Sequence, residues 1–339
     1  MMYARLRLWF FRLDPERAHA LTLKLLHWVG ALPPLGVQIE RAFAASANPV
    51  EVFGLHFPNS VGLAAGYDKD GLAWRGLARL GFGHIEVGTV TLRPQFGNPR
   101  PRLFRLVEDE ALINRLGFPG RGAAFVVRQL QGRRPRGVVL GVNVGLNKDT
   151  PLDRAAEDYS ELQRIFNPLA DYLAVNVSSP NTAGLRELQE QRRLADLLSA
   201  LMINRARPIL VKLSPDLENS DLAAALDVLL SAGVDGVILT NTTVRRDGLV
   251  SGNKTEAGGL SGRPLADLSL AMLERAARHV GGRLPIISVG GIFTKEDGKR
   301  RLASGATLIQ VYSGLVFRGP KVIRELANLS LLKPSETVG

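Results

Sequence analysis

The sequence predicts an α/β protein, a (β/α)8 TIM barrel that follows an N-terminal extension of two helices. Eight short runs that favour β-strands recur along the 339-residue chain, with helical segments between them. Their interiors are rich in Val, Ile and Leu, as expected of parallel strands buried on both faces. A doubly wound sheet fits less well, because no GxGxxG pattern follows the first run. The expected strands are residues 60–65, 84–89, 138–144, 172–177, 209–213, 236–240, 286–289 and 307–311.

The N-terminal extension is predicted from the first 34 residues. An aromatic-rich segment, residues 6–13, ends at Asp14-Pro15-Glu16. These three residues predict the start of a second helix, because Asp14 can cap it, Pro15 fits its first turn and Glu16 suits its dipole. That helix is expected to stop at Pro33-Pro34. Charged residues interrupt every apolar run before it reaches membrane-spanning length. The helices suit a membrane interface and equally a hairpin docked on the barrel. We expect residues 1–45 to form this extension and residues 46–339 to form the barrel domain.

Two segments are additional to the eight strand–helix units of a minimal barrel. Residues 103–107 and 111–115 are expected to form a hairpin inserted after the second strand. Residues 244–260, rich in glycine and charge, are expected to form a long loop after the sixth strand. Barrel enzymes build their sites from the loops that follow the strands, so both segments are candidate lids.

The composition excludes several classes of function. Lysine and arginine number 43 against 32 acidic residues, and the net charge of +11 favours anionic ligands or an anionic membrane surface. The basic residues are mostly scattered arginines, so nucleic acid is not expected as a partner. The lack of cysteine excludes disulfides, cysteine-ligated iron–sulfur clusters and thiolate zinc sites. All five histidines lie outside the expected carboxyl ends of the strands, which argues against a Ser-His-Asp hydrolase and against a metal site.

Polar and small residues gather at the expected carboxyl ends of the strands. A single one is more often a turn or cap residue than a ligand, but a stable barrel does not require a full set of amides and lysines there. Glycine-containing loops after the last two strands occupy the place where barrels bind phosphate. The set comprises Lys69, Thr89, Asn143, Asn176, Ser179, Lys212, Thr240, Asn241, Thr242, Gly290-Gly291 and Tyr312-Ser313-Gly314.

Ser179 and Lys212 stand out within this set. Ser179 lies in a segment, residues 176–182, that carries two amides and three hydroxyls directly after an apolar strand. Because the chain has no cysteine, a nucleophile or base of that size here must be an oxygen. Lys212 is a cation within an apolar strand, which is costly unless it meets an anion or an electron-rich ring.

Seven stretches follow one another along the chain in a recognisable order. They are Ala64-Ala65-Gly66-Tyr67-Asp68-Lys69-Asp70-Gly71, Gly88-Thr89-Val90-Thr91 with Pro94-Gln95, Asn98-Pro99-Arg100-Pro101-Arg102, Asn114-Arg115-Leu116-Gly117-Phe118, residues 176–182, Thr240-Asn241-Thr242-Thr243, and Gly258-Gly259-Leu260-Ser261-Gly262. Together they resemble the dihydroorotate dehydrogenase family over nearly the whole chain. Class 1 members of that family use a cysteine as the catalytic base and class 2 members use a serine. With Ser179 and its N-terminal helices, the chain is similar to class 2, the membrane-associated, quinone-linked type.

The resemblance implies oxidation of dihydroorotate to orotate in pyrimidine biosynthesis, with Ser179 as the catalytic base and Thr182 as a possible proton relay. It implies that FMN is held by Ala65, Gly66, Tyr67, Asp68, Lys69, Thr89, Asn143, Asn176, Lys212, Thr240, Gly262, Gly291, Tyr312 and Ser313. It implies that dihydroorotate is held by Lys69, Asn114, Arg115, Leu116, Gly117, Phe118, Asn176, Asn181, Asn241 and Thr242. A membrane quinone would enter between the N-terminal helices past His19 and Arg105. The enzyme would then lie peripherally on the cytoplasmic face of the cell membrane.

Two other functions remain open at this point. The chain could be another FMN-dependent barrel oxidoreductase that uses a soluble electron acceptor. It could also be a phosphate-binding module without redox activity that lies at a membrane surface, with its basic excess as the lipid contact.

Overall fold

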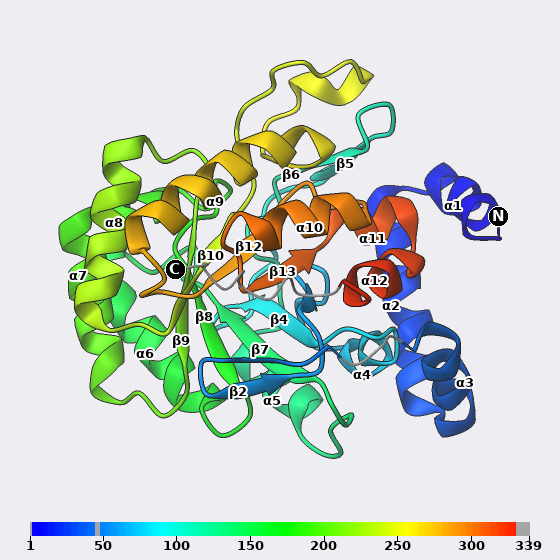
Figure 1. Cartoon of the computed structure of the whole chain (residues 1–339), viewed down its shortest axis with the longest axis horizontal. Coiled ribbons are helices and arrows are strands. Elements are labelled where there is room, and N and C mark those ends of the chain that lie inside the picture. The colour runs from blue at the N-terminus through cyan, green and yellow to red at the C-terminus, as the bar shows by residue number, and fades with distance from the viewer. Residues whose placement is uncertain (1, 45–47, 330–339) are drawn as a thin grey trace, which may run out of the picture.

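The structure is a computed structural model that describes residues 2–44 and 48–329. Eight parallel strands form a closed barrel, in which neighbours along the chain are neighbours in space (Figure 1). Each lies within one residue or two of its expected bounds, so the predicted barrel is confirmed. The strands are β3 (Val61–Leu63), β4 (His84–Val90), β7 (Val139–Val144), β8 (Tyr172–Asn176), β9 (Ile209–Leu213), β10 (Gly236–Leu239), β12 (Ile286–Val289) and β13 (Leu308–Val311).

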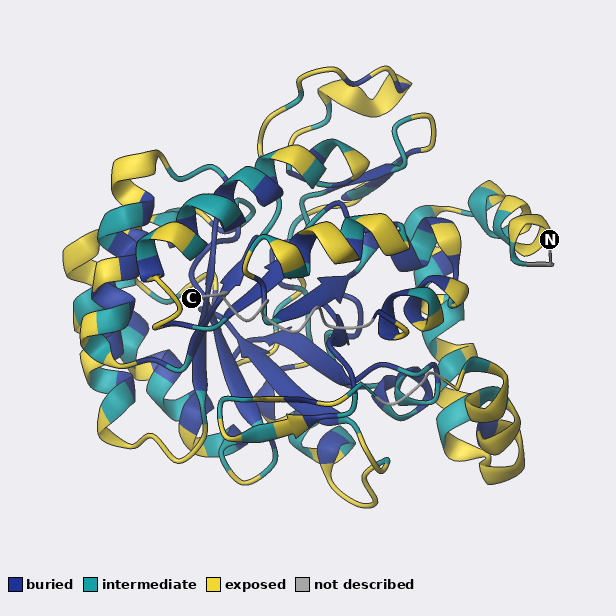
Figure 2. Cartoon of the chain, in the orientation of Figure 1, coloured by how far each residue is buried: buried dark blue, intermediate teal, exposed yellow. Residues whose placement is uncertain are grey.

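Helices surround the barrel and cover its outer face. In α7, Leu194, Leu197, Leu198 and Leu201 recur at helical spacing and are buried against the strands. Figure 2 shows the eight barrel strands buried and the helices around them exposed on their outer sides. The helices are α4 (Trp74–Ala78), α5 (Ala123–Leu130), α6 (Ala155–Phe166), α7 (Gln191–Ile203), α8 (Asn219–Ala232), α9 (Ala266–Val280), α10 (Lys295–Ala303), α11 (Ser313–Arg318) and α12 (Lys321–Ala327), with short 3-10 turns η1 (Leu152–Arg154), η2 (Leu185–Gln189), η3 (Gly252–Thr255) and η4 (Arg263–Leu265).

A small hairpin closes the amino-terminal end of the barrel. It consists of β1 (Val50–Val52) and β2 (Leu55–Phe57), which pair antiparallel. Phe57 is fully buried and meets the ring of His84 edge to face, with centroids 5.4 Å apart. The opposite, carboxyl end is therefore the open one.

The two expected insertions meet in a second sheet. The predicted hairpin is confirmed as β5 (Leu103–Leu106) and β6 (Ala111–Asn114). The predicted long loop is only partly a loop, because its end belongs to a third strand, β11 (Gly259–Gly262), that pairs antiparallel with β6. A Gly-Leu-Ser-Gly stretch has low intrinsic strand propensity, so the pairing partner determines its conformation. Both insertions project from the same end of the barrel (Figure 1).

The N-terminal extension has three described helices where two were expected: α1 (Met2–Arg12), α2 (Pro15–Ala31) and α3 (Pro33–Phe43). The predicted cap is present, since Asp14 Oδ1 accepts hydrogen bonds from the backbone N–H groups of Glu16 and Arg17 at 3.1 and 3.0 Å. Pro33 ends α2 as expected but also opens α3, because proline fits the first turn of a helix. The expected boundary between residues 45 and 46 lies outside the described residues.

The extension is docked on the barrel domain. Helix α2 lies so close to α4 that a Cβ on Gly76 would come within 1.8 Å of the Leu26 carbonyl oxygen. Helix α1 is tied to α11, because the Tyr3 hydroxyl donates to the Val316 carbonyl at 2.7 Å. No single described helix is both long and apolar enough to span a membrane, and α2 with α3 meets that test only as a pair bent by 105°.

Candidate active site

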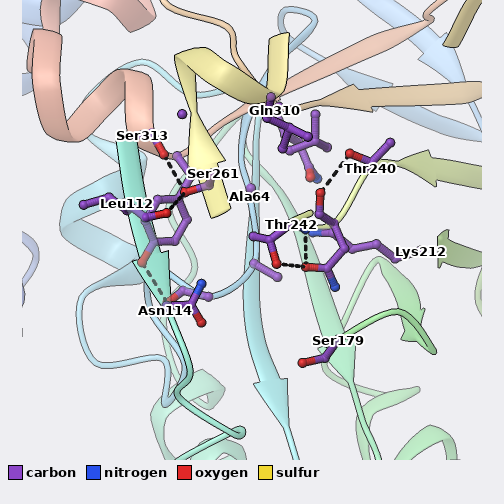
Figure 3. Close-up of a pocket in the computed structure, with 18 of the residues that line it drawn as sticks. Ala64, Leu112, Asn114, Ser179, Lys212, Thr240, Thr242, Ser261, Gln310 and Ser313 are labelled. Carbon is purple, nitrogen blue, oxygen red and sulfur yellow. Dashed lines mark hydrogen bonds between the residues drawn. The ribbon is translucent and has the colours of Figure 1, made fainter. Parts of the chain in front are cut away.

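A cavity of about 130 Å³ opens at the carboxyl ends of the barrel strands. Figure 3 shows Ser261, Ser313 and Asn114 on one side of it and Lys212 and Thr240 on the other, with Ser179 set apart from both. Most residues of the predicted site line this cavity: Ala65, Gly66, Lys69, Thr89, Asn114, Leu116, Gly117, Phe118, Asn176, Ser179, Asn181, Lys212, Thr240, Asn241, Thr242, Gly262, Gly291, Tyr312 and Ser313.

Four residues of the predicted site do not line the cavity. Asn143 lies directly behind its wall, where it contacts Thr89. Asp68 accepts hydrogen bonds from the backbone of Leu72 and Ala73, and burial raises its pKa to about 6. Arg115 points to the loop after β10, with Nη1 2.5 Å from Glu256 Oε2. Tyr67 lines a second cavity instead.

The amides of the cavity are fixed by hydrogen bonds to one another. Thr89 Oγ1 donates to Asn143 Oδ1 at 2.6 Å, and Asn176 Nδ2 donates to Thr89 Oγ1 at 2.9 Å. Asn241 Nδ2 donates to Ser178 Oγ at 2.9 Å and to Asn176 Oδ1 at 3.2 Å. These bonds join β4, β7, β8 and the loop after β10. The side chains are therefore held in one arrangement before any ligand binds.

The loop after β8 places Ser179 at the cavity. Ser179 is 5% exposed, and its Oγ accepts a hydrogen bond from the backbone N–H of Asn181 at 3.2 Å. Asn181 Nδ2 donates to Asn114 Oδ1 at 3.1 Å, which joins this loop to β6. Among the described residues that line the cavity, none is a histidine. Thr182 Oγ1 is buried and has no hydrogen-bond partner among the described residues, so it is free to bond a group that reaches it.

Lys212 has an anionic partner within the barrel, Glu86. Its Nζ lies 4.0 Å from Oε1 of Glu86, and the two side chains are 6% and 0% exposed. Burial lowers the pKa of Lys212, and the Glu86 carboxylate opposes that effect. Lys69 is the second cation of the cavity and is half-buried: its Nζ donates to the Gly66 carbonyl at 2.6 Å, and burial lowers its pKa to about 8.

Gly291 after β12 and Gly262 at the end of β11 line the cavity and pack closely against neighbouring backbone. Gly291 has a φ of 70°, and a Cβ there would lie 2.3 Å from Ala266 Cα. Gly262 likewise has a φ of 105°. The hydroxyls of Ser261 and Ser313 lie 2.9 Å apart beside these glycines. Backbone N–H groups and hydroxyls of this kind suit an anionic oxygen.

A second cavity, of about 270 Å³, lies between α1, α2 and the barrel. Its lining is largely apolar and includes His19 and Arg105, the two residues expected along the path of the quinone. Arg105 donates to the carbonyl oxygens of Phe11 and Leu13, both at 2.7 Å, and so holds the turn between the two helices. His19 meets Tyr67 edge to face at 4.9 Å, and burial lowers the pKa of His19 to about 4.

The two cavities share part of their walls. Leu103, Leu112 and Tyr312 line both of them. Leu103 and Leu112 come from the inserted hairpin, and Tyr312 follows β13. The cavity in the barrel mouth, whose lining includes amides and lysines, thus shares three side chains with an apolar cavity under the N-terminal helices.

Comparison with known proteins decides the family. A family model described as dihydroorotate dehydrogenase matches residues 48–329. The chain belongs to the dihydroorotate dehydrogenase family. It is 51% identical over 333 residues to a dihydroorotate dehydrogenase (quinone) of Roseiflexus sp., covering 96% of this chain and 92% of that protein. It is 47% identical to one of Thiobacillus denitrificans, covering 96% and 98%.

Solved structures agree with this assignment. The dihydroorotate dehydrogenase of Eimeria tenella in complex with ferulenol has a TM-score of 0.85 and 37% sequence identity, covering 93% of this chain and 90% of that one. The ligand-free form of the same enzyme has a TM-score of 0.84 and 38% identity. The resemblance read from the sequence is therefore confirmed.

Some residues of the site were not predicted. Glu86 and Gln310 carry the same signal as Lys212, a polar side chain inside an apolar strand, and could have been found by it. Leu103 and Leu112 carry no such signal, because they are ordinary apolar residues of a hairpin. Only the packing of that hairpin brings them between the two cavities.

Proposed function

We propose that this chain oxidises dihydroorotate to orotate in pyrimidine biosynthesis, with FMN as the hydride acceptor and a membrane quinone as the final electron acceptor. Its family and the names of its relatives support the reaction and the acceptor. The observation that carries the proposal is the pair of cavities that share Leu103, Leu112 and Tyr312. One suits a polar substrate and the other an apolar one, and electrons have a short distance to cross between them.

The residues at the barrel mouth fit FMN. Bound there, FMN would supply a ring that accepts a hydride and passes electrons onward. Amides and hydroxyls that are already fixed by mutual hydrogen bonds can donate to and accept from the ring edge, and the backbone N–H groups of the glycines that line the cavity suit the phosphate. The ring would be held by Ala65, Gly66, Thr89, Asn143, Asn176, Lys212 and Thr240, and the phosphate by Gly262, Gly291, Tyr312 and Ser313.

Dihydroorotate would bind beside Ser179. Asn114, Asn176, Asn181 and Asn241, together with Thr242, offer the alternating donors and acceptors that a cyclic imide needs. Lys69 would bind the carboxylate, and residues 115–118 would complete the enclosure. Ser179 would remove the proton from C5 of the substrate, and Thr182, whose buried hydroxyl has no partner among the described residues, would carry that proton outward.

The quinone would occupy the second cavity, past His19 and Arg105. Apolar side chains line it, as a quinone ring requires. Leu8, Trp9 and Trp28 on the same helices are more than half exposed, which suits burial in a membrane surface. The enzyme would lie peripherally on the cytoplasmic face of the membrane. Residues 1–45 would thus serve the quinone, and residues 46–339 the flavin and the substrate.

An acceptor screen tests the proposal. We expect the purified protein to be yellow, to be bleached anaerobically by dihydroorotate, and to regain its colour with a quinone in detergent but not with fumarate or NAD+. A colourless preparation that FMN does not reconstitute would contradict the cofactor. Reoxidation by fumarate or NAD+ in place of quinone would contradict the acceptor.

A further inference from the structure

The barrel interior contains one buried pair of opposite charges. The eight barrel strands carry four titratable side chains, His84, Glu86, Tyr172 and Lys212. Burial lowers the pKa of His84 to about 3 and raises that of Tyr172, so both are neutral at pH 7. Beyond the strand ends, Lys69 and Tyr312 face the same cavity. Within the strands, Glu86 is the sole counter-charge to Lys212.

Neutral donors hold the Glu86 carboxylate in place from three other strands. Asn143 Nδ2 donates to Oε1 at 2.8 Å. The Tyr172 hydroxyl and Gln310 Nε2 donate to Oε2 at 3.1 and 3.0 Å. Such bonds satisfy both oxygens of the buried carboxylate and fix its position.

Glycines on neighbouring strands make the space for this network. A Cβ on Gly62 would lie 2.0 Å from Nε2 of His84, and a Cβ on Gly141 would lie 2.1 Å from Cζ of Tyr172. A buried ion pair adds little to the stability of a fold and is often replaceable by apolar side chains. A barrel that needed only stability would fill this space with Val and Leu, so the pair calls for another explanation.

The pair is oriented relative to the cavity. Lys212 lines the cavity, as Figure 3 also shows, whereas Glu86 does not. The positive end therefore faces the flavin site, and the negative end faces the barrel interior. Without Glu86, Lys212 would be a buried cation with no counter-ion in the strands, and burial would favour its neutral form.

We propose that Glu86 is a positioning residue that keeps Lys212 protonated at the flavin site, so that negative charge arriving there meets a cation that is already in place. This inference rests on the proposed function. Glu86 does not line the cavity and reaches it through the side chains that it contacts, of which Lys212 alone is a cation. Because Lys212 is then charged before electrons arrive, the lysine takes up no proton when they do.

A count of protons tests the proposal. With Lys212 already charged, two electrons from a redox mediator enter the flavin site together with one proton from solvent. The midpoint potential then falls by about 30 mV per pH unit, which corresponds to a tenfold change in the equilibrium constant of the two-electron reduction. In Glu86→Gln, Lys212 begins neutral and takes up a second proton from solvent as the two electrons enter. The slope should then double to about 60 mV per pH unit, which corresponds to a hundredfold change in that equilibrium constant per pH unit.

The charge-retaining variant is the matched control. Glu86→Asp keeps an anion near Lys212, so its slope should stay close to that of the wild type. An unchanged slope in Glu86→Gln, or the same change in both variants, would overturn the proposal. Circular dichroism of each variant shows that the comparison is made between folded proteins.

A direct titration of Lys212 tests the role of Glu86 independently of the proposed function. The Cε resonance of Lys212 in protein labelled with 13C-lysine is identified by its loss in Lys212→Met. We expect a charged Lys212 at pH 7 in the wild type and a proton affinity at least roughly tenfold weaker in Glu86→Gln. A neutral Lys212 in the wild type overturns the inference even if no Glu86 variant folds. Protein that binds no flavin would contradict the proposed function, while this titration would still test the pairing of Glu86 with Lys212.

Discussion

The two cavities of this protein are built in different ways. The cavity at the barrel mouth is lined by strand ends whose amides bond one another, and its main functional candidates, Ser179 and Lys212, are each 5% exposed. The cavity under the N-terminal helices is bounded by elements on the surface, and Arg105 holds their turn through two backbone carbonyls. The side chains of the first site are held by one another, whereas the second site depends on how α1 and α2 dock on the barrel. Substitutions in the two cavities should therefore affect different half-reactions.

The largest effect is expected from Ser179→Ala. Loss of a general base typically costs 10²- to 10⁴-fold in rate, so reduction of the flavin by dihydroorotate should slow by roughly that factor. FMN content, and reoxidation by quinone after chemical reduction, should not change. Stopped-flow absorbance measures the two half-reactions separately. Ser199→Ala, on the exposed face of α7, is the control, and normal reduction in Ser179→Ala would remove Ser179 from the base role.

The pH dependence of substrate binding should come next in size. Burial lowers the pKa of Lys69 to about 8, so its ammonium group is present below that pH and is lost above it. Because the ammonium form binds the carboxylate, the KM for dihydroorotate should be flat below pH 8 and rise about tenfold per unit above it. Steady-state kinetics from pH 6.5 to 9.5 measures this rise.

The KM for quinone, which we propose binds in the second cavity, is the control for that pH profile. The KM for quinone should show no such rise, because burial lowers the pKa of His19 to about 4 and keeps it neutral throughout this range. Lys69→Met should bind dihydroorotate weakly at every pH. A wild-type KM for dihydroorotate that stays constant to pH 9.5 would show that Lys69 does not hold the carboxylate.

The sequence predicted the first cavity better than the second for a physical reason. The strand ends of a closed barrel converge, so Thr89, Asn176 and Lys212 could be assigned to one place from strand order alone. The second cavity depends on where the N-terminal helices pack. The spacing of apolar residues predicts such helices but does not specify their packing partners. The strand propensity of residues 259–262 was likewise too low to reveal β11, since pairing with β6 determines it.

Arg105→Ala should separate the half-reactions in the other direction. It removes two charge-assisted hydrogen bonds from the turn between α1 and α2, so we expect quinone turnover to fall by about tenfold. Reduction by dihydroorotate should stay at the wild-type rate. Arg12→Ala is the matched control, because Arg12 lies exposed at the end of α1. Equal losses in both half-reactions would mean that the two cavities are not separable.

The smallest effect is expected at the membrane-facing side of the same helices. Trp9 and Trp28 are 51% and 56% exposed and do not line the second cavity, so Trp9→Ala and Trp28→Ala should leave turnover with a soluble quinone in detergent unchanged. Each removes aromatic surface that a membrane interface would bury, and co-sedimentation with anionic vesicles should weaken by roughly three- to tenfold per substitution.

Ile203→Ala is the control for that measurement. Ile203 is 78% exposed, but it ends α7, on the opposite side of the barrel from α1 (Figure 1). Added salt should weaken vesicle binding of all variants alike, since the net charge of +11 is unchanged. If Ile203→Ala released the protein as readily as the tryptophan variants, the exposed apolar residues of α1 and α2 would not be the membrane contact. The second cavity would then need another route for its quinone.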